Sequence, residues 1–180
     1  PENTTVAEVE MGYQLSKSSY ITANIYDIVN KHAIVYYTDV NNEDSYSNLG
    51  KTGTRGAEIE YKYKGRNGYA TLNYSFYSAL GKNCVDVYKV EAHPEVLTAF
   101  PAHKINASAG IKLSNHLVLN PSLSFMSERF YSLDMDSATT ATYKLNPAIF
   151  GNIYLNFSNV FTEGFNLNIG CDNITNEKIL

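Results

Sequence analysis

The sequence predicts an all-β fold, an antiparallel up-and-down meander of about eight strands. Apolar and polar residues alternate with a period of two along most of the chain, and no stretch shows a helical period. Composition agrees, because 15 of the 180 residues are tyrosine, which favours pleated, half-buried surfaces. The chain is 44% hydrophobic with a net charge of −4, which suits one domain and gives no basic stripe for a nucleic-acid partner.

The stretch 56–64 shows the alternation most clearly. Its odd-numbered residues from Ala57 to Tyr63 are apolar, whereas its even-numbered residues from Glu58 to Lys64 are charged. Since side chains alternate across a strand, one face of this strand is apolar and the other is charged. Similar alternation marks the other expected strands in chain order, at residues 4–15, 21–37, 69–77, 104–113, 117–125, 149–157 and 165–172.

The expected connections differ in length from one strand to the next. Those after the first, third, fifth and seventh strands are short. Those after the second, fourth and sixth are long polar loops, at about 39–53, 81–102 and 127–143. Alternate connections of a meander lie at the same end of the sheet, so one end has tight turns and the other has long loops. This asymmetry is typical of outer-membrane barrels, whose long loops lie outside the cell.

The composition of the polar face separates a barrel from a soluble sandwich, which also alternates. The polar face is rich in Asn, Ser, Thr and Gly, whereas soluble β proteins place more Lys and Glu outside and protect their edges with charge. The pattern therefore favours a large transmembrane β-barrel with an apolar face towards lipid and a wet interior. Tyrosines near strand ends would form its interfacial girdle, namely Tyr13, Tyr61, Tyr63 and Tyr74.

Four segments, in order, carry a resemblance to a known family. They are TTVAEVEMGYQLS with YITANIYDI, YSNLGKTGTRGAEIEY, FPAHKINASAGIKL with LVLNPSLSF, and FNLNIGCDNITNEKIL. Each motif is degenerate, but together they span almost the whole chain. The series resembles the C-terminal part of the barrel of TonB-dependent outer-membrane receptors.

The resemblance implies a fold, a location and partners. Residues 1–180 would be one partial β-barrel, roughly the last third of a barrel of about 22 strands, with the final strand and the plug domain outside the chain. The protein would lie in the outer membrane of a Gram-negative bacterium and contact lipid, its own plug and, through the plug, TonB. It would take up a scarce nutrient, most often a ferric siderophore or similar extracellular metal chelate. It would be a transporter and not an enzyme, with no cofactor.

Two other functions fit the same pattern. One is a passive or structural outer-membrane barrel without a plug. The other is a soluble β-sandwich binding module, such as a carbohydrate binder. A sandwich would bury Ile59, Leu72 and Leu155 in a compact core, whereas a barrel would leave them on an outer face.

No catalytic or metal-binding set stands out. Glu58 and Glu60 share a face about 7 Å apart, which could suit a hydrolase, but lumen-facing charges are the favoured interpretation. The histidines and the two cysteines, Cys84 and Cys171, have no metal-type spacing. Function is therefore expected on the long loops. The candidate ligand contacts there are Asp39, Glu43, Asp44, Tyr46, Tyr88, Glu91, His93, Glu95, Arg129, Tyr131, Asp134 and Asp136.

Overall fold

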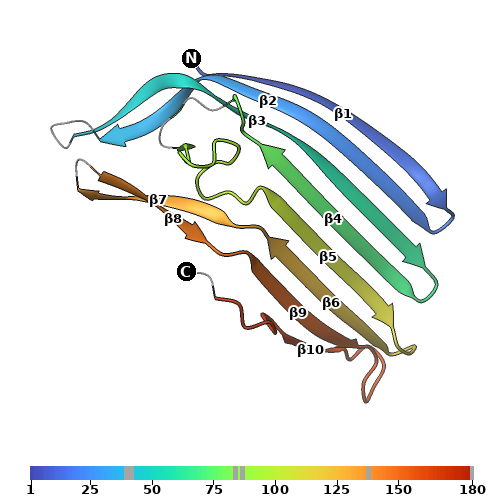
Figure 1. Ribbon diagram of the computed structural model, residues 1–180. Coiled ribbons are helices and arrows are strands. Elements are labelled where there is room, and N and C mark those ends of the chain that lie inside the picture. Colours follow the sequence, from blue (N-terminus) through green and yellow to red (C-terminus); the bar gives the residue numbers. More distant parts are fainter. Residues whose placement is uncertain (39–42, 83–84, 86–87, 137–138, 179–180) are drawn as a thin grey trace.

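The computed structural model describes residues 1–38, 43–82, 85, 88–136 and 139–178 (Figure 1). The described residues form ten strands. These are β1 (Asn3–Ser16), β2 (Ser19–Thr38), β3 (Asp44–Gly65), β4 (Gly68–Ser78), β5 (His103–Lys112), β6 (Leu117–Met126), β7 (Arg129–Asp136), β8 (Thr139–Leu145), β9 (Ala148–Phe157) and β10 (Leu167–Cys171). No helix in this described part is long and apolar enough to cross a membrane.

Eight of the strands form one antiparallel sheet. Its order is β1-β2-β3-β4-β5-β6-β9-β10, while β7 and β8 form a separate two-stranded sheet. Every pair in the large sheet joins strands that follow one another, except that the β7–β8 hairpin is inserted between β6 and β9. The predicted meander of about eight strands is confirmed.

The register places the alternating apolar residues of all eight strands on one face, here called the apolar face. Ile59 of β3, for example, lies between Ala23 of β2 and Tyr74 of β4. Although Ile59 and Leu72 lie well inside the sheet, their exposed fractions are 44% and 46%. Within the described residues no second layer covers this face, as a soluble sandwich would require.

The opposite side, here called the polar face, is fastened by short side chains that bond across the strands. Ser124 Oγ donates to Asn106 Oδ1 at 2.7 Å, and the Thr71 and Ser108 hydroxyls lie 3.1 Å apart. Asn152 Nδ2 contributes a further bond across the sheet, to a serine of β6. Such cross-strand pairs stabilise a sheet without requiring a packed core on that side.

The buried apolar residues lie mainly at one end of the sheet. Val85 packs on Ala33 and Val35 of β2, and Val90 and Val96 of the β4–β5 connection pack on Phe130 of β7. Figure 1 shows the β2–β3 extension, the β4–β5 connection and the β7–β8 hairpin together on the left, opposite the tight turns on the right. The predicted difference between the two ends is therefore confirmed.

Two of the three expected loops are instead largely strand. Residues 39–53 were expected to be a loop, but β2 reaches Thr38 and β3 begins at Asp44, with Tyr36 paired to Tyr46. The pairing is interrupted at His32 and Gly50, which have φ of 57° and 59°, and it resumes in the same register beyond them, so both strands can bend there. The expected loop 127–143 similarly contains the β7–β8 hairpin. The sequence analysis missed both hairpins because these stretches are rich in polar residues.

The expected tyrosine girdle is only partly at strand ends. Tyr13, Tyr61 and Tyr63 lie on the apolar face near the tight turns. Tyr74 instead lies further along β4 between Ile59 and Ile105, where its hydroxyl is 2.8 Å from His103 Nδ1.

Candidate binding surfaces at the loop end and on the polar face

The predicted ligand contacts in the first connection lie at the outer end of the β2–β3 hairpin, beyond the bend at His32 and Gly50. Asp39 lies outside the described residues. Glu43 immediately precedes β3. Asp44 and Tyr46 belong to β3 and are held by pairing with β2 rather than by a loop. All three are exposed.

An aromatic pair is the main feature of this hairpin. The Tyr46 ring meets that of its cross-strand partner Tyr36 edge-on, at a centroid distance of 5.5 Å. Their exposed fractions are 72% and 50%, and Ile34 is similarly exposed. Large aromatic faces held open in this way suit a bulky, partly apolar ligand. Tyr36 was missed by the sequence analysis, because residues 33–36 form a continuous apolar run and do not alternate in the sequence.

The second connection brings two predicted residues together and leaves two apart. Tyr88 and Glu91 are exposed. His93 Nδ1 lies 3.2 Å from Glu95 Oε1, and the His93 ring stacks on Phe130 at 4.4 Å. This contact joins the second connection to the third. The two residues line a cavity of about 210 Å³ whose wall also includes His103, Ser127 and Glu128.

The third connection places its predicted residues on β7. Arg129 is half-buried, and its Nε is buried with no hydrogen-bond partner among the described residues. Tyr131 stacks on Tyr143 of β8 at 5.3 Å, a second aromatic pair at this end. Asp134 and Asp136 belong to β7, but their side chains lie outside the described residues.

Metal binding by side chains has no basis in the described residues. No three groups from His, Cys, Asp and Glu come together there in a way that could hold a metal ion. The His93–Glu95 pair therefore offers hydrogen bonds and charge rather than a metal centre.

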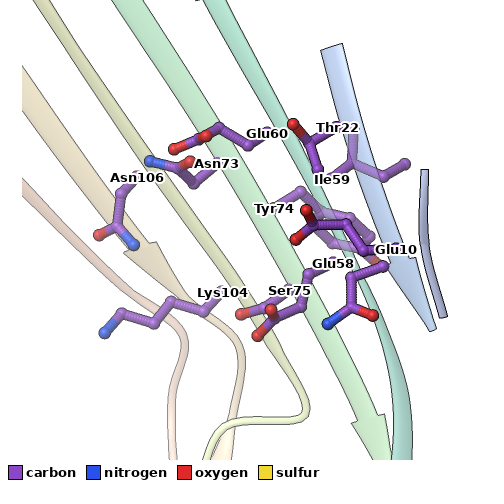
Figure 2. Close-up of a pocket in the computed structure, with 11 residues that line it drawn as sticks. Glu10, Thr22, Glu58, Ile59, Glu60, Asn73, Tyr74, Ser75, Lys104 and Asn106 are labelled. Carbon is purple, nitrogen blue, oxygen red and sulfur yellow. The ribbon is translucent and has the colours of Figure 1, made fainter. Parts of the chain in front are cut away.

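The polar face carries a second hollow, of about 430 Å³ (Figure 2). The side chains of Glu10, Glu58 and Glu60 come to it from β1 and β3, and those of Asn106 and Lys104 come from β5. Glu60 also pairs with the exposed Lys62 at 2.5 Å. The wall is thus polar and acidic, so it suits a hydrated or basic partner better than an apolar one.

Comparisons with known proteins give a fold but no sequence relative. No family model matches the chain, and no curated protein matches it. Similar solved structures include the FrpB iron transporter of Neisseria meningitidis, at 14% identity and a TM-score of 0.72. The siderophore receptor PirA of Acinetobacter baumannii has 13% identity and a TM-score of 0.74. The ferric-catecholate import receptor Fiu of E. coli K12 has 16% identity and a TM-score of 0.73.

Each of these matches covers 97% of this chain but between 24% and 28% of the other. The chain therefore spans about a quarter of the length of the structures it matches. Its fold is that of a segment of the β-barrel of such receptors. The three neighbours are a transporter and two receptors rather than enzymes.

Proposed function

We propose that the chain is part of the barrel of a TonB-dependent outer-membrane receptor that actively takes up a ferric siderophore or similar metal chelate. The observation that carries the proposal is the single sheet with an uncovered apolar face and a hydrogen-bonded polar face, matched over 97% of the chain by iron and siderophore receptors. The four sequence motifs support the same family.

The two faces would divide the work of such a receptor. The apolar face would lie against lipid, since it has no other cover in the described residues. The polar face would line the interior, where the acidic hollow at Glu10, Glu58 and Glu60 would face a plug domain. Energy would reach the plug from TonB. The residues of this chain form the wall and do no covalent chemistry.

The loop end would hold the ligand. The Tyr36–Tyr46 and Tyr131–Tyr143 pairs offer aromatic faces, and the half-buried Arg129 offers a guanidinium cation that suits an acidic chelate. The ligand contacts predicted in the three connections remain proposals. Tyr36 is added to them because its ring packs against that of Tyr46.

Uptake measurements test the function. In cells grown without iron, deletion of the gene should abolish uptake of its cognate ⁵⁵Fe chelate, identified by screening a panel of ferric siderophores. Deletion of tonB or addition of a protonophore should abolish it equally. Uptake that continues in both treatments would indicate a passive barrel without a plug and would contradict active transport.

A further inference from the structure

At the loop end, the rows of the sheet just beyond the apolar face carry basic side chains. Arg55 lies opposite Asp27 in the row beyond Ile25, and Lys51 lies opposite Lys31 four residues further along. Strand alternation puts all four on the same face as Ile25. Lys31 and Arg55 are exposed.

Within the described residues, this part of the sheet carries more positive than negative side chains. Lys82 of the β4–β5 connection donates to both carboxylate oxygens of Asp27, at 2.5 and 2.6 Å. Lys51 and Arg55 are close enough to act on the same carboxylate. In the described part of the chain, Asp27 is the one acid that the registers place in these rows, beside four cations. The excess is notable in a chain whose net charge is −4.

The Lys31–Lys51 pair indicates the kind of ligand that this group would bind. Like charges directly opposite each other in a sheet are destabilising. An anion bound between the two ammonium groups would remove that repulsion. Arg55 would add a planar, forked donor, which suits phosphate.

The position of these side chains indicates which kind of anion they would bind. A groove of about 520 Å³ lies on the apolar face just below them. Its apolar lining is Ala7, Val9, Ile25, Ala57 and Phe76, and its wall also includes Glu8, Tyr26, Asp27, Arg55 and Gly56. From Tyr63 to Arg55, β3 has roughly the nine to eleven residues that a tilted strand needs to cross the hydrocarbon core. The cations therefore lie at headgroup level, and the apolar groove below them suits an acyl chain.

We propose that Lys31, Lys51 and Arg55 bind the phosphate of an anionic outer-leaflet lipid whose acyl chain lies in this groove. The inference rests on the proposed function only in requiring that the sheet span the outer membrane. The Asp27–Lys82 pair would position the β4–β5 connection beside the headgroup.

The test uses the full-length protein in phosphatidylcholine nanodiscs, titrated with diphosphoryl lipid A and analysed by native mass spectrometry. The Lys31→Gln/Lys51→Gln/Arg55→Gln variant should bind roughly a hundred-fold more weakly, since each basic residue near such a surface contributes about a factor of five. The matched control, Lys62→Gln/Lys64→Gln/Lys104→Gln, removes as many cations from the polar face and should bind like the wild type. Millimolar inorganic phosphate should not displace the lipid.

A single substitution makes the proposal independent of the triple variant's folding. Without lipid A, Lys51→Gln should raise the unfolding midpoint because it removes the repulsion with Lys31. With lipid A present, the same change should lower the midpoint relative to the wild type. Unchanged lipid binding in the triple variant, loss of binding in the control, displacement by phosphate, or no reversal in the Lys51→Gln midpoint would each overturn the proposal. Failure to enter the membrane would instead contradict the proposed function.

Discussion

Tyr69 lies directly opposite Gly110 in the β4–β5 ladder, and its ring fills the space that a side chain at Gly110 would need. A Cβ at Gly110 would come within 2.3 Å of Tyr69 Cε1. Tyr154 lies in the same way against Gly170, and Tyr26 lies against Gly56, where the Phe76 carbonyl oxygen is also close. Aromatic cover of a strand glycine pins register and protects its backbone. These pairs therefore tie neighbouring strands together on the polar face.

Substitution of Gly110 should separate the ring from its partner strand. We expect Gly110→Val to lower the free energy of unfolding by about 1–3 kcal/mol, because Tyr69 must leave its position and lose its bond to Asn120. Urea unfolding in lipid vesicles measures this. In a Tyr69→Ala background, Gly110→Val should lower the free energy of unfolding by a smaller amount. The difference between the two backgrounds, which is the coupling energy of the pair, should be about 0.5–3 kcal/mol.

The adjacent residue supplies the control. Ala109 lies on the apolar face of the same strand, so Ala109→Val adds bulk where no ring lies opposite in the register, against Ala70. Its effect should stay within about 0.5 kcal/mol. Equal costs for Gly110→Val with and without Tyr69 would show that the ring does not explain the glycine.

The Asp27–Lys82 pair should hold the β4–β5 connection rather than the whole sheet. The Lys82 side chain is only 11% exposed, so Asp27→Asn would leave a largely buried ammonium without its partner carboxylate. We expect the amides of Ala79 and Lys82 to exchange about ten-fold faster, with no change in the strands. Hydrogen exchange followed by mass spectrometry resolves the two regions.

A second ion pair provides the comparison for that measurement. Glu60→Gln breaks the exposed Lys62–Glu60 bridge, which should leave exchange unchanged because surface pairs contribute little. Faster exchange throughout the sheet in Asp27→Asn would contradict a local role for Lys82.

A charge on the apolar face should cost far more than the same charge on the polar face. Leu72→Arg would place a cation in the hydrocarbon region and should destabilise the protein in vesicles by about 2–4 kcal/mol. Asn73→Arg, one residue away, would face the polar hollow and should cost about 1 kcal/mol or less. Similar costs at both positions would contradict the assignment of the faces.

The aromatic pair on the β2–β3 hairpin should affect ligand binding without affecting stability. Because both rings are largely exposed, Tyr36→Ala and Tyr46→Ala should weaken binding of the proposed chelate ligand about three- to ten-fold each. Tyr13→Ala, near the tight turns, should leave affinity unchanged. Whole-cell binding curves with labelled chelate would show whether the effect is confined to the loop end.

The sequence alone was sufficient for the large sheet because each of its strands obeys a simple periodicity. Ile59 and Glu60 reveal opposite faces by their chemistry, and the same alternation marks the other strands of the large sheet. The same reasoning failed at the outer hairpins. Tyr46 and Thr142 lie in polar stretches whose strand pairing depends on a bend at His32 and Gly50, or on packing around Phe130, and neither leaves a local pattern.

The candidate site was predicted less completely for the same reason. His93 and Glu95 are two residues apart, so their contact could be expected once both were singled out. The stacking of His93 on Phe130 joins two connections far apart in the sequence. The cation group of Lys31, Lys51 and Arg55 depends on the register of β2 with the part of β3 that precedes the expected strand at 56–64.

The central claim is that the apolar face meets lipid and the polar face does not. Spin labels at positions 59, 72 and 123, and at 60, 73 and 106, test it in the full-length protein in outer-membrane vesicles. Labels of the first set should be relaxed by oxygen, which concentrates in lipid, and those of the second by a water-soluble nickel chelate. Accessibility that fails to alternate, or a first set shielded from both reagents as in a packed core, would contradict it.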